Sequence, residues 1–548
     1  MSDQIQQKLS DSRSMRWTAL ILLAGAMFFA YIFVDILSPL QGLLQTQRGW
    51  DPVAYGHYAG SEPFLNVFVF FLIFAGIILD KMGVRFTAVL SGIVMVIGAG
   101  LNWFAVTDTF EASSLKIFMD NILNLPDVWW NITPWYDGMP ASAKLAAIGF
   151  MVFGCGTEMA GITVSRGIVK WFTGHELALA MGVEMAIARL GVAVVVVGSP
   201  LLASINPVSV SRPVAAGLLL VCIALMMFIV YFFMDKKLDA QSGEAEEKDD
   251  PFKVSDIGKI LSSKMFWVVA LLCVLYYSAI FPFQKYAVNM LQCNIDFVAP
   301  HPSSFWASDQ VAFIQYFVML VVAATSFISN FKKGLMKGAL LATSIIFLIL
   351  FCYMSYERQS AESIFAVFPL LAVGITPILG KYVDNKGKAA TMLMLGSILL
   401  IICHLTFAFV LPQFKGNNIG GIALAFVTIL VLGSSFSLVP AALWPSVPKL
   451  VDSKVIGSAY ALIFWIQNIG LWLFPLLIGK VLNASNPEIV QQLADGTIAP
   501  EVASVSYNYT NPLMMLASLG ILALVMGFWL KIEDKRKGYG LEKPNITG

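Results

Sequence analysis

Long apolar segments alternate with short polar links along almost the whole chain. Fourteen of these segments are long and apolar enough to cross a bilayer as helices. Six precede a hydrophilic stretch at 235–262, and eight follow it. Within that stretch, we expect disorder at 239–250 and a short surface helix at 251–263. The predicted spans are 17–42, 53–79, 86–106, 142–169, 176–204, 212–234, 264–291, 311–330, 338–357, 362–381, 389–412, 419–447, 455–481 and 511–531.

The charges of the links predict which ends of the spans face the cytoplasm. Every second link carries Lys or Arg, as do both tails, whereas the other links are poor in these residues. By the positive-inside rule, both termini then lie in the cytoplasm. Residues 107–140 and 292–310 are expected outside, and residues 331–337 and 382–388 inside.

The composition places most of the chain in lipid. It is 58% hydrophobic and 13% charged, with a mean hydropathy of +0.76, whereas a soluble protein carries about 25% charged residues. The net charge of +1 argues neither for nor against an acidic partner, and the apolar segments leave no room for a nucleic-acid-binding module. The six cysteines lack metal-ligand or disulfide spacing, and no nucleophile–base pair or phosphate loop is visible. We therefore expect neither an enzyme nor a cofactor.

A short motif occurs after the second span and again after the tenth. In each copy a glycine ends the span, an acid follows, and a glycine turn leads to a base that opens the next helix. Each feature has a plain structural reason, but its recurrence implies duplicated halves. We expect a first lobe at 1–234, a cytoplasmic linker at 235–262 and a second lobe at 263–548, with a helix pair inserted near 311–357. The motif residues are Gly76, Asp80, Gly83 and Arg85, and then Gly380, Asp384, Gly387 and Lys388.

Two residues of opposite charge lie deep in neighbouring spans. Counted at about 1.5 Å per residue from the polar turn between the fourth and fifth spans, Glu158 lies roughly 18 Å deep and Arg189 roughly 20 Å deep. Ionisable groups at this depth usually face a partner or a water-filled path. The two residues could form a structural ion pair or bind a ligand with both charges. We favour the ligand, because transporters place substrate sites at this depth and Arg can bind a carboxylate through two parallel hydrogen bonds.

Longer stretches add a resemblance to a known family. The two loop motifs resemble the major facilitator superfamily, and three segments are similar to its lysosomal dipeptide-transporter branch and the prokaryotic relatives of that branch. The resemblance implies an all-α integral membrane fold with two pseudo-symmetric six-helix lobes, to which this chain adds two helices. It also implies that Glu158 holds the amine of a dipeptide, that Arg189 holds its carboxylate, and that Trp444 lines the cavity from the second lobe. The similar segments are 158–191, which contains VKWFTGHELALAMGVEMAIARLG, Tyr276–Phe283 (YYSAIFPF), and Ala442–Leu471, which contains ALWP and IQN.

The second lobe offers neutral groups opposite these charges. When ARLG in the fifth span is laid on QNIG at 467–470, Asn468 falls opposite Arg189. Tyr276 and Tyr277 in the seventh span are further binding candidates within an aromatic stripe that otherwise serves packing. We therefore expect the charge of the site in one lobe, and amides and aromatic rings in the other.

Other ionisable residues in the spans are candidates for gating or proton transfer. Asp35 and Glu62 lie in the outer parts of spans one and two, and Lys285 lies in the outer part of span seven. Lys285 could pair with an acid as an outer gate, or either acid could carry a proton. Glu184 could be a proton site or a partner of the nearby arginine. His404 could titrate, although a histidine hydrogen-bonded between helices is the commoner case.

These observations predict a secondary transporter that moves dipeptides or similar small zwitterions by alternating access. One alternative is a transporter of amino acids or small organic anions. Another is a receptor or scaffold on a transporter fold, which would require the midplane charges to be locked to each other. The expected partners are the small-molecule cargo, the lipid bilayer and, where transport is proton-coupled, protons. We expect a monomer in a bacterial inner membrane, with the lysosomal membrane as the alternative.

Overall fold

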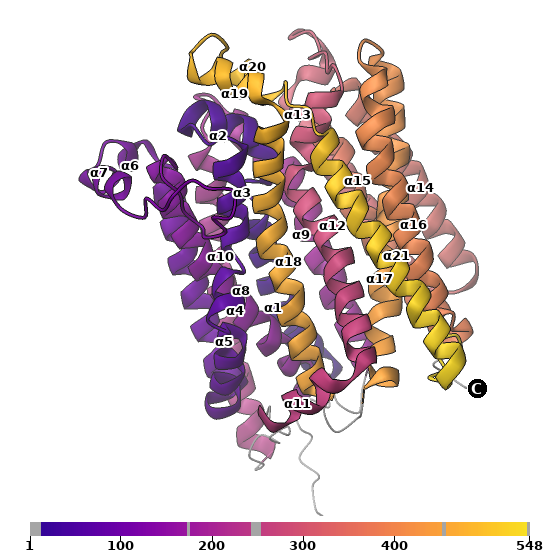
Figure 1. The fold of residues 1–548 in the computed structure, drawn as a ribbon. Coiled ribbons are helices and arrows are strands. Elements are labelled where there is room, and N and C mark those ends of the chain that lie inside the picture. The colour runs from indigo at the N-terminus through magenta and orange to yellow at the C-terminus, as the bar shows by residue number, and fades with distance from the viewer. Residues whose placement is uncertain (1–11, 173–175, 243–253, 452–455, 545–548) are drawn as a thin grey trace, which may run out of the picture.

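The computed structural model describes residues 12–172, 176–242, 254–451 and 456–544, and these residues fold into helices joined by loops (Figure 1). Thirteen helices in this part of the chain are long and apolar enough to cross a membrane. They run side by side, with short helices at both ends of the bundle. The protein is therefore a multi-pass integral membrane protein. Of the stretch at 239–250 that we expected to be disordered, residues 239–242 are instead helical, and residues 243–250 lie outside the described residues.

The first six predicted spans correspond to the helices up to α10. This helix continues past residue 235, where we expected a linker to begin, because Asp235 is buried and hydrogen-bonded. Its carboxylate accepts bonds from Lys170 Nζ at 2.7 Å and Trp171 Nε1 at 2.8 Å. The elements are α1 (Arg13–Val34), η2 (Ser38–Leu40), α2 (Gln41–Arg48), α3 (Pro52–Ser61), α4 (Phe64–Phe68), α5 (Phe71–Ala105), α6 (Asp108–Glu111), α7 (Ser114–Asn121), α8 (Ala141–Phe172), α9 (Leu177–Ser204) and α10 (Ser211–Ser242).

The chain turns back on itself within α5. Gly83 interrupts the helix with φ 77° and ψ 167°, a conformation that favours glycine. Glu62 before this turn and Met95 after it both lie against Gly154–Gly156 of α8, so the segments on either side of the turn run in opposite directions. The second predicted span thus ends, and the third begins, within the single element α5. This is why thirteen long helices correspond to fourteen predicted spans.

The remaining elements form the second half of the bundle. The surface helix expected at 251–263 is confirmed as α11, and the inserted pair consists of α13 and α14. The elements are α11 (Val254–Ser262), α12 (Lys264–Asn294), η3 (Phe305–Ala307), α13 (Asp309–Ser329), α14 (Gly334–Glu357), α15 (Ala361–Lys386), α16 (Ala389–Leu405), η4 (Thr406–Val410), η5 (Leu411–Phe414), α17 (Asn418–Leu450), α18 (Ile456–Ser485), α19 (Pro487–Ala494), α20 (Pro500–Ser504) and α21 (Thr510–Lys537).

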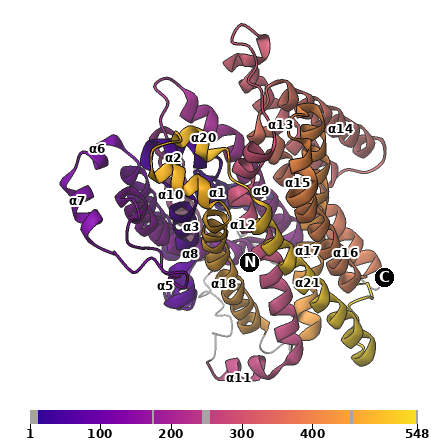
Figure 2. The same cartoon turned by 45° about the horizontal axis from the view of Figure 1, so that its top comes forward.

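The helices pack as two groups that meet along two seams (Figure 2). In the first half α1, α5, α8 and α10 pack together, and in the second half α12, α15, α16, α17 and α21 do so. One seam joins α3 to α18, and the other joins α9 to α15. The inserted helix α13 lies at the second seam, where Tyr316 donates a hydrogen bond to the carbonyl of Val194 in α9 at 3.2 Å.

Close backbone contact seals the seam between α3 and α18. A Cβ on Gly479 would lie 2.2 Å from the carbonyl oxygen of Pro52, and one on Gly56 would lie 2.7 Å from that of Pro475. Glycine therefore allows the two helices to approach closely. We call this end of the bundle, which carries α6, α7, α19 and α20, the outer end, following the orientation that the loop charges predict.

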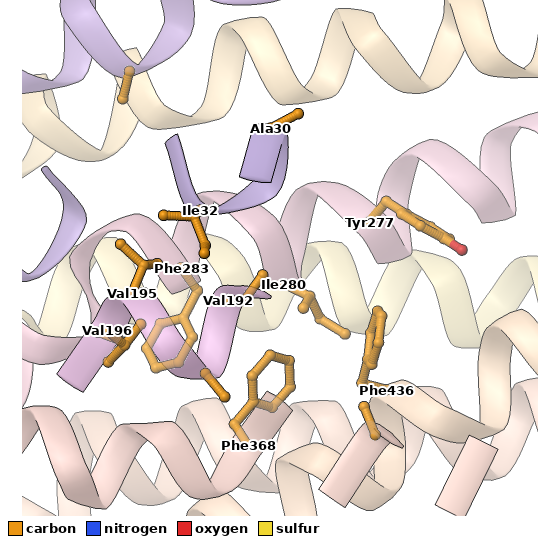
Figure 3. Close-up of a cluster of buried hydrophobic side chains, with 14 of the residues drawn as sticks. Ala30, Ile32, Val192, Val195, Val196, Tyr277, Ile280, Phe283, Phe368 and Phe436 are labelled. Atoms are coloured by element: carbon orange, nitrogen blue, oxygen red, sulfur yellow. The ribbon is translucent and has the colours of Figure 1, made fainter. Parts of the chain in front are cut away.

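An apolar cluster fills the region between the halves near the second seam (Figure 3). Its side chains come from helices of both groups, so the halves share one hydrophobic core. Burial of such side chains stabilises their contact by roughly 25 cal/mol per Å² of apolar surface where water is displaced. The labelled members are Ala30 and Ile32 of α1, Val192, Val195 and Val196 of α9, Tyr277, Ile280 and Phe283 of α12, Phe368 of α15 and Phe436 of α17.

Candidate functional site

Glu158 and Asn468 meet across the middle of the bundle. Glu158 lies in α8 of the first half and Asn468 in α18 of the second, and Asn468 Nδ2 donates a hydrogen bond to Glu158 Oε1 at 3.3 Å. Asn468 is 4% exposed, whereas Glu158 is half-buried. The carboxylate therefore has one neutral partner and keeps further acceptor capacity for a cation.

Arg189 of α9 is held by aromatic rings. Its guanidinium carbon lies 5.1 Å from the ring centroid of Phe281 in α12 and 4.9 Å from that of Phe436 in α17. No carboxylate among the described residues lies within ion-pair distance of Arg189, and Glu158 is no exception. Contact with ring faces leaves the N–H groups at the edge of a guanidinium available for a planar anion. The two midplane charges are thus held separately, which differs from a locked structural pair.

Tyr277 and Trp444 form an aromatic wall in the second half. Trp444 Nε1 donates to the hydroxyl of Tyr277 at 3.1 Å, which links α17 to α12. The Trp444 ring stacks on Phe464 with 4.8 Å between centroids, and the hydroxyl of Tyr460 donates to the Trp444 carbonyl at 3.0 Å. Tyr277 is also an electrostatic neighbour of Arg189, so the wall adjoins the charged side of the site.

Two sequence candidates lie away from this group. Tyr276 is fully buried between α12 and α17, with its hydroxyl 2.6 Å from Ser435 Oγ. His404 is buried in α16, where Nδ1 lies 2.9 Å from the Leu400 carbonyl of its own helix. The ring of His404 packs against Phe283, with 5.2 Å between centroids. The structure therefore places both side chains in packing between helices rather than beside Glu158 or Arg189.

Tyr31 is a further candidate for the site, which the sequence did not single out. It lies in α1, and its electrostatic neighbours are Arg189, Glu184, Glu158 and Glu62. Its hydroxyl thus interacts with charged side chains from α8, from α9 and from the end of α3, all in the first half. The available signal was a single tyrosine within the otherwise apolar FFAYIFV stretch of the first span. Glu184 lies on the same helix as Arg189 and interacts with it electrostatically, although the two form no ion pair in the described structure.

Lys285 and Asp35 form a buried pair towards the outer end. Lys285 Nζ lies 2.8 Å from Asp35 Oδ1, with the side chains 11% and 3% exposed, and Gln284 Nε2 donates to Asp35 Oδ2 at 2.7 Å. Lys285 also donates to the carbonyl of Val34 at 2.7 Å. Glu62 is an electrostatic neighbour of both members and of the central glutamate. The pair joins α12 to the end of α1, so it connects the two halves.

The sequence comparison decides the family. The sequence profile of the Major Facilitator Superfamily matches residues 23–475, most of the chain and parts of both halves. The chain belongs to this superfamily. This match identifies the superfamily, and it does not test the role of any individual site residue.

Curated relatives include a lysosomal dipeptide transporter, MFSD1. The chain is 24% identical to the Danio rerio protein over 348 residues, and 23% identical to the Homo sapiens protein over 349 residues. Each alignment covers 62% of this chain and 60% of the relative. The chain thus spans about three fifths of the length of the curated relatives it matches.

Solved structures share the fold of this superfamily member at low sequence identity. The nucleoside transporter NupG superposes with a TM-score of 0.58 at 11% identity, covering 93% of this chain and 99% of its own. A bacterial homologue of the human lysosomal transporter Spinster gives 0.57 at 12%, with coverage of 95% and 98%. A structure described as giving insight into substrate recognition in proton-dependent oligopeptide transporters gives 0.55 at 11%, with coverage of 94% and 99%. These likenesses establish the fold.

The first loop motif of this superfamily protein ties helix ends together. Asp80 Oδ1 pairs with Arg166 Nη1 of α8 at 2.5 Å. Arg85 Nε lies 4.0 Å from Asp235 Oδ2 of α10. Gly76 has open space at its Cβ position, whereas Gly83 supplies the left-handed turn described above. The motif therefore connects α5 to both α8 and α10.

The second motif shares the glycine turn of the first and adds a contact with the C-terminal segment. Gly387 and Lys388 have φ angles of 74° and 65°, and Asp384 is an electrostatic neighbour of Lys449 in α17. A Cβ on Gly387 would lie 2.4 Å from the backbone of Lys543, so the turn packs directly on the C-terminal segment. Gly380, like its counterpart in the first copy, has open space around it. In the described part of the chain, no group of three or more His, Cys, Asp or Glu side chains is placed to hold a metal.

Proposed function

We propose that this protein transports dipeptides or similar small zwitterions across a membrane by alternating access. The observation that supports this most is the separate holding of Glu158 and Arg189, each with neutral or aromatic neighbours. A ligand with an amine at one end and a carboxylate at the other would satisfy both. The relatives described as lysosomal dipeptide transporters support the same cargo class.

Each end of a dipeptide has a suitable partner. The α-ammonium group is a compact cation that donates hydrogen bonds to the carboxylate of Glu158. The terminal carboxylate is planar and matches the paired N–H groups of a guanidinium, and the Arg189 guanidinium carbon lies over the rings of Phe281 and Phe436. The variable middle of the dipeptide would lie towards the wall formed by Tyr277 and Trp444. Tyr276 and Asn468 would act indirectly, by fixing α12 and α8.

The alternatives make fewer demands on these residues. A small organic anion would need only Arg189, and Glu158 would then remain as an unmatched carboxylate. A single amino acid carries the same two charges on a shorter frame. A receptor or scaffold would require the two midplane charges to be locked together, and the described ion pairs include no such lock. We infer that one copy of the chain is enough for transport, because its two halves meet at the candidate site, through Asn468 and Glu158.

Uptake into proteoliposomes tests this proposal. Purified protein would be supplied with labelled dipeptides, single amino acids and organic acids at the same concentration, with empty liposomes as the control. We expect saturable uptake of free dipeptides and at least tenfold weaker uptake of the other two classes. Preferential uptake of organic acids would overturn the dipeptide assignment. Repeating the assay with an imposed pH gradient tests whether transport is coupled to protons, and neutral variants of Asp35, Glu62 and Glu184 would then test which residue carries them.

A further inference from the structure

Residues 122–137, which we call the outer strap, connect α7 to α8 and are braced from within. Asn131 Nδ2 donates to the carbonyls of Pro126 at 3.1 Å and Trp135 at 2.9 Å. The backbone N–H of Asp137 donates to the carbonyl of Leu125 at 2.7 Å. Hydrogen bonds within the strap therefore hold it together, so we expect it to move as one unit.

A buried lysine fixes the strap to its own half. Lys144, in the first turn of α8, is 1% exposed. Its Nζ donates to the carbonyls of Met119 at 3.2 Å and Ile122 at 3.0 Å, and to the side-chain oxygen of Asn124. His57 of α3 adds a contact from its Nδ1 to the carbonyl of Thr133 at 2.7 Å. The strap thus moves with the first half.

A second buried lysine holds the strap from the opposite half. Lys480 of α18 is 6% exposed, and its Nζ donates to the carbonyls of Val128 and Trp129 at 3.1 Å each and of Asn131 at 2.6 Å. Trp472, two turns earlier on α18, donates from Nε1 to the carbonyl of Ile132 at 3.2 Å. An ammonium group has three donors, so these three carbonyls satisfy it completely.

This arrangement couples the strap to the closure of the outer end. No carboxylate in the described structure forms an ion pair with Lys480, and its electrostatic neighbour Asp127 belongs to the strap, so its buried charge depends on the strap. Separation of α18 from α3 at the outer end would remove all three bonds at once. We propose that the outer strap is a latch, and that Lys480 is the residue that fastens it while the outer end is closed. The latch rests on the alternating access proposed above, but not on the identity of the cargo.

Distances between spin labels test the latch without any cargo. In a background lacking the six native cysteines, one label pair at Trp130 and Glu488 reports the strap, and another at Ser204 and Glu488 reports the two halves. Lys480→Met keeps the length of the side chain and removes its donors. We expect this variant to increase the outward-open population at least tenfold, seen as longer distances for both pairs.

Lys144→Met is the matched control, since it removes an equally buried ammonium from the same strap on the other side. It should alter the strap pair and leave the pair between the halves as in the unmodified protein, because the strap stays attached to the first half through His57 and through its chain connections to α7 and α8. Unchanged distances between the halves in Lys480→Met, or equal changes in both variants, would overturn the latch. If Lys480→Met does not fold, Trp472→Phe removes a single donor and should shift the same pair in the same direction, and the absence of a shift counts against the latch. If the distances change as expected but the unmodified protein takes up no dipeptide, the proposed cargo is wrong and the latch stands.

Discussion

Asn468 donates a hydrogen bond to Glu158 over 3.3 Å, and this contact joins α18 to α8 at the centre of the molecule. Asn468 aligns with Arg189 when the two halves are superposed by sequence. The pseudo-symmetry therefore places an amide in one half and a guanidinium in the other, and both adjoin the candidate site. A carboxylate that accepts a neutral amide bond can exchange it for a charged amine at little loss, because the charge-assisted bond is the stronger one.

Replacement of Glu158 by Gln should weaken uptake of free dipeptides at least tenfold. A hydrogen bond to a charged group contributes about 1.5–3 kcal/mol, and Gln keeps the size of the side chain while losing the charge. N-acetylated dipeptides lack the cation, so their uptake should be poor in the unmodified protein and nearly unaffected by the substitution. Equal uptake of acetylated and free dipeptides by the unmodified protein would remove this role from Glu158.

Replacement of Arg189 by Lys should impair uptake strongly although it keeps the charge. An ammonium group cannot make the two parallel bonds of a guanidinium, and it lacks the planar, delocalised charge that lies over the rings of Phe281 and Phe436. The loss should appear chiefly as a raised KM in initial-rate uptake assays. The exchange Glu158→Arg with Arg189→Glu should give folded but inactive protein, and an active exchange variant would favour a structural pair instead.

Trp444 should matter through its indole N–H as well as its ring. Trp444→Phe keeps the stacking on Phe464 but removes the donor to Tyr277, whereas Trp444→Ala removes both. We expect both variants to reach the membrane, and we expect the alanine variant to lose more uptake than the phenylalanine variant. Tyr277→Phe combined with Trp444→Phe should cost little more than either change alone, because both remove the same hydrogen bond. Strictly additive losses in this cycle would show that the bond is not used.

The pair between Asp35 and Lys285 predicts a stability pattern. Removal of one member leaves the other charge buried without its partner, which destabilises the folded protein by about 3–5 kcal/mol. Removal of both members avoids that penalty. Asp35→Asn and Lys285→Met should each lower the thermal unfolding midpoint in detergent. The double variant should recover most of the loss. A double variant that is less stable than both single variants would show that the two charges are not mutual partners.

The orientation of the loops can be tested with an impermeant thiol reagent. Cysteines placed singly at 107–140 and 292–310 should react from outside in intact cells, whereas those at 331–337 and 382–388 should react only after the membrane is opened. The control is a protein without native cysteines. Reaction of the 331–337 loop in intact cells would contradict the orientation of the inserted pair.

Much of the fold was predictable because lipid imposes length and apolarity on each span. The turn at Gly83 was placed correctly by its glycine and flanking charges, as was the turn at Gly387. The end of α10 was not, because the burial of Asp235 depends on Lys170 and Trp171, which are remote in sequence. Local charge alone cannot reveal such a partner.

The candidate site was predictable only where charge was conspicuous. Glu158 and Arg189 stand out as ionisable residues in apolar segments, and so does the pair between Asp35 and Lys285. Tyr31 does not stand out, because a tyrosine in a span is ordinarily packing and its importance comes from charges on α8 and α9. The reverse holds for Tyr276, which is adjacent to Tyr277 in sequence but points towards Ser435 on another side of the helix.

The inserted helices give the molecule two unlike flanks. At one seam α3 meets α18 through glycine contacts, and the outer strap bonds to both helices at the outer end. At the other seam α13 rests on both α9 and α15, with α14 outside it. A lipid or neighbouring protein diffusing in the bilayer therefore meets the added helix pair at one seam, whereas the other seam is crossed by a loop at its outer end. The two lateral surfaces that this transporter presents to the membrane therefore differ, although its two halves are built alike.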